Sequence, residues 1–348
     1  MKKIIFLIIT LISFNIIAQD YLINLPDDLV QKVLSAEKYV FDLEYEQAGF
    51  ICKEINKKYP KSPIGNLCFL IIFESQMVDN DDFYLDDVFN AYLKRAEKIT
   101  KKIETKKYFW TKLFAGAFYG IKGLHYLRKH ENIEALKVGY HGVELLKEAH
   151  KLDPKKFDAL LGLGIYNYYS DTLSSKTWWF PFQIGNRDVG FDQLRSSTNM
   201  SLMAKDPSRL MLAYLYFCEE KYKQAEIHFN LIKEKYPKNL ISRLMLGRIY
   251  LAQNELDKAE VYINEALKID PQKYKAHAIM AQIKITKKDY QSAKNYYDLS
   301  LKLSKSNERR AESLIGIARC YAAIEDNVNK NKYISMAKDE NKEIKIDF

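Results

Sequence analysis

Residues 212–237 read LAYLYFCEEKYKQAEIHFNLIKEKYP, and residues 246–271, 34 positions later, read LGRIYLAQNELDKAEVYINEALKIDP. Both stretches begin with a leucine and a small residue, place a tyrosine four positions after the leucine, and end on a proline. A third stretch continues the step, because positions 225, 259 and 293 are all alanine. A fixed step of this length indicates a chain built from repeated units rather than around one central core.

Each repeated unit is predicted to be a pair of helices, since the chain holds only 13 glycines and 8 prolines. Small residues at 213, 247 and 281 and the alanines of the second helix let two backbones approach closely, and Pro237 and Pro271 end that helix. The pattern Leu-Gly-x2-Tyr, Ala, Ala-x3-Phe, Pro resembles tetratricopeptide repeats. The resemblance implies an all-α fold, a right-handed helical solenoid of about eight helix hairpins.

The repeats are less regular before residue 206. Pro154 and Pro207 are 53 residues apart, which is 19 more than one unit. We expect a signal peptide at 1–18, an irregular N-terminal repeat array at 19–205 with an aromatic insertion at 170–187, a regular array at 206–339, and a C-terminal tail at 340–348. No linker rich in Gly, Pro or Ser divides these parts.

The N-terminus begins MKK, continues with a mostly apolar run from Ile4 to Ile17, and then reads Ala18-Gln19. This order predicts a signal peptide that is cleaved after Ala18, and hence an exported protein of the periplasm or envelope. The apolar run is shorter than the roughly 20 residues that a spanning helix needs, so no stable transmembrane span is expected after cleavage. The bulky Ile16 leaves open the alternative of an uncleaved anchor.

The net charge is +9, from 54 basic and 45 acidic residues. Removing residues 1–18 removes two lysines and no acid, which leaves 52 basic residues against 45 and a charge of +7. The lysines alternate with acids along the helical stretches, which is typical of a solvated surface. Together with export, this argues against a nucleic-acid partner.

The motifs of common enzymes are absent from the sequence: it contains no Gly-x-Ser-x-Gly, no phosphate-binding loop and no His-Glu-x-x-His. His125, His130, His141 and His150 lie close in sequence, but no two of them are four residues apart, so they predict no metal site. We therefore predict a protein that is not an enzyme, with no catalytic residue and no cofactor. The acidic stretch 79–82 lacks the glycine of a calcium loop and is expected to begin a helix.

The cysteines form no CxxC pair and are too few for a disulfide framework, so they are interpreted as small buried apolar side chains. Two of them, Cys52 and Cys68, lie in neighbouring units, and whether these are bridged is left open. The other two, Cys218 and Cys320, are separated by too many helix layers to be joined.

The first helices of successive repeats carry one polar or amphipathic residue directly after the small position. These residues are Tyr214, Arg248, Gln282 and Arg319. Their matched spacing predicts a stripe on the concave wall that suits a peptide backbone or acidic side chains. We expect a protein or peptide partner of unknown identity, and the alternative is that the four residues are merely solvated.

The insertion at 170–187 contains Trp178 and Trp179, followed by Phe180-Pro181-Phe182. Aromatic residues in a long exposed loop would form an anchor for a protein, a glycan or a lipid. The competing interpretation is that these rings fill a hydrophobic gap between helices. A glycan- or lipid-binding module that uses this loop is therefore the alternative to a protein-binding scaffold.

The stretch from Tyr108 to Tyr216 resembles a family of exported bacterial tetratricopeptide proteins through three blocks, which are residues 116–120 (GAFYG), 158–166 (DALLGLGIY) and 188–191 (DVGF). The last block and residues 212–216 are also similar to a eukaryotic tetratricopeptide family linked to clearance of protein inclusions and to lipid homeostasis. The shared motifs are largely structural, so this resemblance implies the fold rather than an activity.

Overall fold

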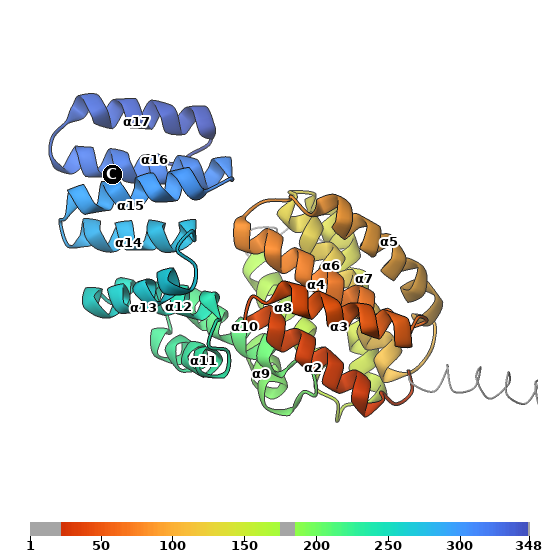
Figure 1. Cartoon of the computed structure of the whole chain (residues 1–348). Helices are drawn as coiled ribbons and strands as arrows, with labels where there is room; N and C mark the ends of the chain where they lie inside the picture. Colours follow the sequence, from red (N-terminus) through yellow and green to blue (C-terminus); the bar gives the residue numbers. More distant parts are fainter. Residues whose placement is uncertain (1–21, 175–184, 347–348) are drawn as a thin grey trace, which may run out of the picture. The chain divides into compact units, whose positions relative to one another are not determined.

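The computed structural model describes residues 22–174 and 185–346, and these residues form sixteen helices and no strands. Consecutive helices run as antiparallel pairs (Figure 1), which confirms the predicted all-α class. The chain divides into two compact units, unit 1 (1–75 and 85–212) and unit 2 (76–84 and 213–348). The helices of unit 1 are α2 (Asp27–Phe41), α3 (Tyr45–Lys58), α5 (Asp86–Ile103), α6 (Phe109–Arg128), α7 (Asn132–Leu152), α8 (Ala159–Ser174) and α9 (Arg187–Met200). The helices of unit 2 are α11 (Tyr222–Lys235), α12 (Leu240–Ala252), α13 (Leu256–Ile269), α14 (Tyr274–Thr286), α15 (Tyr290–Leu303), α16 (Asn307–Ala323) and α17 (Asn327–Glu340), and both α4 (Ile64–Asn80) and α10 (Lys205–Cys218) contribute to the two units.

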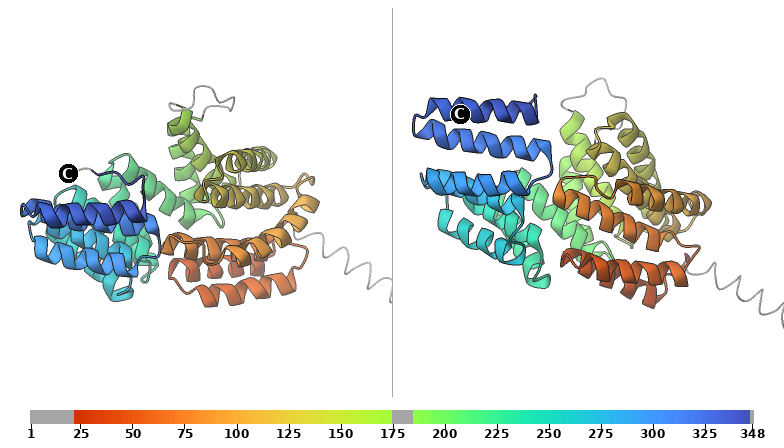
Figure 2. Two further views of the ribbon diagram at one scale, coloured as in Figure 1. Left: turned by 90° about the horizontal axis from the view of Figure 1, so that it is seen from above. Right: turned by 45° about the horizontal axis from the view of Figure 1, so that its top comes forward.

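The turns inside the hairpins of unit 2 repeat with the same step as the sequence. Glu220, Asn254 and Lys288 recur at the spacing of the repeat alanines, and each has a left-handed backbone with φ between 56° and 62°. The amide after each of them donates to a carbonyl five residues back, at 2.8–2.9 Å, which closes the end of the first helix. The same turn therefore reverses the chain in each hairpin, and Figure 2 shows α14 to α17, in blue, as one stack of antiparallel helices.

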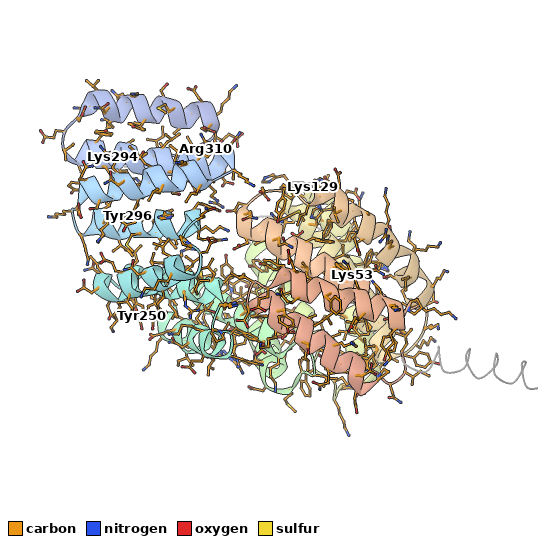
Figure 3. The ribbon with its side chains drawn as sticks, viewed as in Figure 1. Lys53, Lys129, Tyr250, Lys294, Tyr296 and Arg310 are labelled. Carbon is orange, nitrogen blue, oxygen red and sulfur yellow. The ribbon has the colours of Figure 1, made fainter. Side chains whose placement is uncertain are left out.

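Aromatic pairs join the two helices of several hairpins in unit 2. Tyr250 stacks on Tyr262 with 5.4 Å between ring centroids (Figure 3), and Tyr321 stacks on Tyr333 at 5.5 Å. Tyr216 makes the equivalent contact with the ring of His228 at 5.8 Å. The tyrosine that follows the leucine of the first helix thus joins the hairpin, which accounts for part of the high tyrosine content of 25.

The small positions lie where the helices of a hairpin approach most closely. A Cβ atom added to Gly247 would lie 2.4 Å from Cδ1 of Ile263 and 3.6 Å from the carbonyl oxygen of Ala259. Ala259 and Ile263 are themselves completely buried. The predicted contact between α12 and α13 is therefore present at the predicted residues.

Substitution of Ala259 by leucine (Ala259→Leu) is expected to lower the free energy of unfolding by about 1–3 kcal/mol, because the added atoms must displace α12 from α13. Equilibrium urea unfolding followed by circular dichroism measures the change. Ala252→Leu is the matched control, since Ala252 is an exposed helical residue of the same hairpin. An Ala259→Leu midpoint equal to that of the control would contradict the close contact.

In unit 1, glycines bring two pairs of helices into backbone contact. A Cβ atom on Gly164 of α8 would lie 2.9 Å from the carbonyl oxygen of Gly190, and one on Gly190 of α9 would lie 2.8 Å from the carbonyl oxygen of Gly164. Gly116 and Gly142 face each other in the same way across α6 and α7, at 3.0 Å in both directions. The GAFYG, DALLGLGIY and DVGF blocks therefore contain the residues that allow close helix crossings.

A charge cluster centred on a buried histidine joins three helices of unit 1. His125 of α6 is 1% exposed, and its Nδ1 lies 2.9 Å from Glu74 of α4 while its Nε2 lies 2.8 Å from Asp86 of α5. Arg128 donates to Glu74 at 2.7 Å and Lys129 donates to Asp86 at 2.9 Å. Positive and negative groups thus alternate through the cluster, so each carboxylate has two partners of opposite charge when the imidazole is protonated.

The acidic stretch at 79–82 ends a helix and does not begin one, so that expectation is wrong. Asp79 and Asn80 are the last residues of α4, and Asp81 follows with a left-handed backbone, φ 50°. The helix dipole disfavours carboxylates at this end. Here they are held by cations from a distant part of the chain, which periodicity within 79–82 could not reveal.

The four cysteines are unpaired, and only Cys52 and Cys320 are buried. A hydrogen bond with the side chain of Cys68, followed by burial, raises the pKa of the Cys52 thiol far above its ordinary value. These two thiols are therefore in contact between α3 and α4. Among the helices of the described ranges, none is both long and apolar enough to cross a membrane.

Candidate protein-binding surface

The four residues predicted from matched spacing, which we call the ladder, lie one on each first helix of the regular repeats. Tyr214 is on α10, Arg248 on α12, Gln282 on α14 and Arg319 on α16. All four side chains are exposed, and in every case both neighbours in sequence are buried. Because α12 contacts α14 and α14 contacts α16, these first helices lie side by side, with one exposed ladder residue on each.

Apolar side chains lie on either side of the ladder residues along the same helices. Positions four before and three after each ladder residue occupy the same helix face as that residue. Most of these positions are half-buried, and they are Leu210, Phe217, Leu251, Ala278, Ile285 and Ala322. The surface therefore combines polar groups with partly exposed apolar groups, which is typical of protein interfaces.

Arg248 is held over an aromatic ring of the preceding repeat. Its Cζ lies 4.9 Å from the ring centroid of Phe217, although the side chain as a whole is exposed. Burial raises the pKa of Tyr214, with a further contribution from the adjacent Cys218, while the positive charge of Arg248 acts in the opposite direction. Stacking thus positions a guanidinium whose donors suit a carboxylate ligand.

Phe217 was missed by the sequence analysis, although its place three residues after Tyr214 could have identified it as part of the same face. The structure leaves Trp178 and Trp179 outside the described residues, so the aromatic insertion and its alternatives stay predictions. No group of three or more His, Cys, Asp and Glu side chains in the described part of the chain is arranged to hold a metal ion.

Family comparisons locate tetratricopeptide repeats in unit 2. One tetratricopeptide-repeat family matches residues 219–283 and a second matches residues 274–307. These ranges cover α11 to α15 and confirm the repeats predicted there. The comparison with curated proteins gave no significant match.

Solved structures with a similar fold come from several organisms. One is pilF of Pseudomonas aeruginosa, with 18% identity over 67% of this chain and 95% of that chain and a TM-score of 0.46. Another is PilW, described as a widely conserved type IV pilus biogenesis factor, with 16% identity, coverage of 66% and 95%, and a TM-score of 0.47. A third is yeast Tom70, with 15% identity, coverage of 95% and 83%, and a TM-score of 0.41.

Proposed function

We propose that this protein is a non-catalytic scaffold that binds another protein through the ladder surface of unit 2. The observation that carries the proposal is the set of four exposed ladder residues on four successive first helices, each between buried neighbours. A surface that serves only to solvate the helices would not need Arg248 to be stacked on Phe217 across two repeats. The confirmed tetratricopeptide repeats support a binding role, because arrays of stacked repeats present extended binding surfaces.

The chemistry of the surface indicates a peptide with both acidic and apolar side chains. Arg248 and Arg319 supply planar, permanently charged donors that suit carboxylates. Half-buried groups such as Leu251 and Ile285 supply the apolar contact that gives an interface most of its stability. A ligand that lies across the ladder would use both kinds of group in adjacent repeats.

The place of action that we propose is the bacterial envelope, which the first eighteen residues support. Export with cleavage after Ala18 would produce a mature chain that begins at Gln19. Mass spectrometry of the N-terminal peptide of the protein from cells tests this part of the proposal, and a retained MKK sequence would contradict cleavage.

The double substitution Arg248→Glu with Arg319→Glu is expected to abolish partner capture. Two charge reversals change the local field felt by an acidic peptide, while surface substitutions move stability by only about half a kcal/mol each. Crosslinking of the tagged full chain in cells, followed by mass spectrometry, compares the captured proteins, and circular dichroism checks that the melting curve is unchanged.

A matched control is Lys223→Glu with Lys302→Glu, which makes the same change of net charge on exposed residues of the second helices α11 and α15. Capture should survive in the control and fail in the ladder variant. If capture is the same in all three proteins, the ladder is not the site. In that case a Trp178→Ala and Trp179→Ala variant, tested with glycans and lipid vesicles, examines the alternative function.

A further inference from the structure

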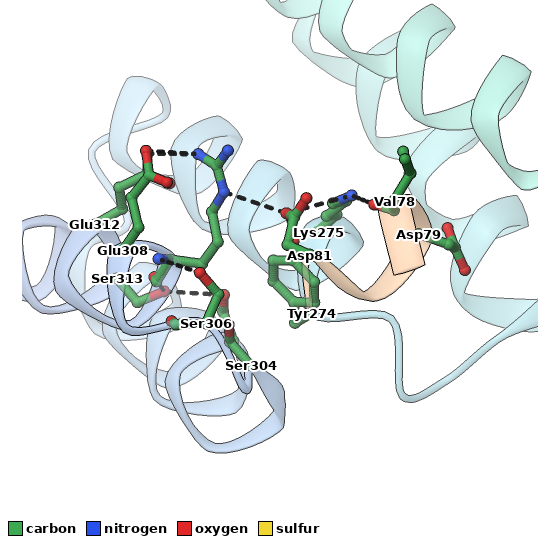
Figure 4. A network of polar contacts seen from close by, with 12 residues as sticks. Val78, Asp79, Asp81, Tyr274, Lys275, Ser304, Ser306, Glu308, Glu312 and Ser313 are labelled. Atoms are coloured by element: carbon green, nitrogen blue, oxygen red, sulfur yellow. Dashed lines mark hydrogen bonds and ion pairs between the residues drawn. The ribbon is translucent and has the colours of Figure 1, made fainter. Parts of the chain in front are cut away.

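Unit 2 includes a short segment that is far from the rest of the unit in sequence, Gln76–Tyr84. It reads QMVDNDDFY and consists of the last turn of α4 and the turn that follows. Figure 4 shows this segment against the N-terminal ends of α14 and α16, which come much later in the chain. The array of helices in unit 2 therefore already holds a peptide segment that is not one of its repeats.

The residues that hold the segment form a site that we call the cradle, which is Lys273, Tyr274, Lys275 and Arg309. Three of them converge on the carboxylate of Asp81: the Tyr274 hydroxyl, Nζ of Lys275 at 3.4 Å and Nε of Arg309 at 3.2 Å. Burial acts to raise the pKa of the Asp81 carboxyl, but Lys275, Tyr274 and Arg309 together hold it below its ordinary value. The cradle thus binds this aspartate in its charged form.

The cradle also binds the backbone of the segment. Lys275 donates from Nζ to the carbonyl oxygen of Val78 at 3.0 Å, and Lys273 donates to the carbonyl oxygen of Asp79 at 3.1 Å. Lys273 in addition pairs with the Asp79 carboxylate, and its own side chain is only 4% exposed. The last carbonyls of a helix have no partner within the helix, so this site recognises a helix end together with its acids.

Neither the cradle nor the segment is arranged for its own stability. Asp79 and Asp81 lie at the end of α4 where the helix dipole repels negative charge. The two lysines of the cradle repel each other, and burial together with the charge of Lys273 lowers the pKa of Lys275. Each side carries a cost that only the other side offsets, as a ligand and its binding site do.

The cradle lies on the same helices as the ladder. Lys275 precedes Gln282 by seven residues on α14, so the two lie on one face about 10 Å apart. On α16, Arg309 precedes Arg319 by ten residues. A partner that lies along α14 at the ladder would therefore also reach the cradle.

We propose that the cradle is a binding site for an acidic peptide and that Gln76–Tyr84 is its internal ligand, which a protein partner displaces. This inference rests on the proposed protein-binding function and specifies the partner: a helix that ends in an Asp-x-Asp sequence, with its last carbonyls free. Competition from within the chain would make the site selective, because a tethered segment acts at an effective concentration on the order of millimolar. Only a partner that also contacts the ladder would exceed that competition.

The test uses a fluorescent peptide with the sequence of residues 74–86, ESQMVDNDDFYLD, and measures its binding by anisotropy. We expect weak binding to the wild-type mature chain. The Asp79→Asn and Asp81→Asn chain, whose cradle is no longer held by its own carboxylates, should bind the peptide at least about tenfold more tightly. Added Lys275→Glu and Arg309→Glu substitutions should remove this binding, and salt should weaken it.

The control chain carries Asp192→Asn and Asp339→Asn, which make the same change of charge at exposed residues outside the cradle, and it should behave as the wild type. Equal affinity for the wild-type and the Asp79→Asn and Asp81→Asn chains would overturn the inference. Loss of cooperative melting in the latter, seen by circular dichroism, would also overturn it, because the segment would then be a structural part of unit 2. If peptide binding fails while ladder-dependent crosslinking persists, the inference is wrong and the proposed scaffold function stands.

Discussion

The substitution Gly190→Ala is expected to lower the stability of unit 1 by about 3 kcal/mol or more, although it adds a single carbon atom. That atom would lie 2.8 Å from the carbonyl oxygen of Gly164 and 2.9 Å from the amide nitrogen of Tyr168. Both neighbours are backbone atoms of α8, so neither can turn away as the end of a side chain can. The helices must separate, and the buried contact of Phe191 with Tyr168, at 5.6 Å between ring centroids, would be lost with them.

Hydrogen exchange of the amides in α8 and α9 is the appropriate measurement, because a chain of two units need not unfold in one step. Exchange should accelerate about a hundredfold or more in these helices, which corresponds to about 3 kcal/mol. Gly120→Ala is the matched control, since a Cβ atom there meets nothing within 4 Å. The control should leave stability unchanged or raise it by up to about 1 kcal/mol, and equal exchange in the two variants would exclude the close crossing.

The sequence was sufficient to predict the features that recur. The fixed step between repeats predicted the hairpins, the small positions and the alternation of buried and exposed residues on the first helices, because each repeat meets the same neighbours. Ala259, Gly247 and Tyr250 all make the contacts that their positions predicted. The ladder residues also have the exposure that periodicity implies, although their role stays a prediction.

The features that occur once could not be predicted in the same way. The acids at 79–82 were expected to begin a helix, because their partners Lys273 and Arg309 lie far away along the chain and no local pattern links them. The pairing of Gly164 with Gly190 depends on a single helix crossing that no repeat period specifies. Likewise, the four histidines between 125 and 150 were considered together as a metal site, and the structure instead places one of them, His125, between two carboxylates.

Removal of that histidine is the other change with a large expected effect. His125→Ala should lower the free energy of unfolding by about 3–5 kcal/mol near neutral pH, because it leaves Glu74 and Asp86 with one partner fewer and removes a ring that stacks on Phe89 at 4.1 Å. Urea unfolding gives the magnitude. His141→Ala is the control, since its side chain is half exposed and its pairing with Glu104 is a surface contact worth about 1 kcal/mol or less.

The pH dependence separates the loss of charge pairing from the loss of packing. Burial acts to raise the pKa of Glu74, but His125 and Arg128 hold it below its ordinary value, and the pKa of Asp86 is lowered in the same way by Lys129 and His125. Groups with a lowered pKa in the folded state bind fewer protons than in the unfolded state, so their stabilisation is complete above the ordinary carboxyl range and is lost as the pH falls below about 4. In His125→Ala, burial remains while a compensating donor is gone, so the carboxylates stabilise less at neutral pH. The difference in stability between wild type and variant should therefore shrink below about pH 4, whereas a cavity alone would leave it constant, and a constant difference would show that His125 acts only by packing.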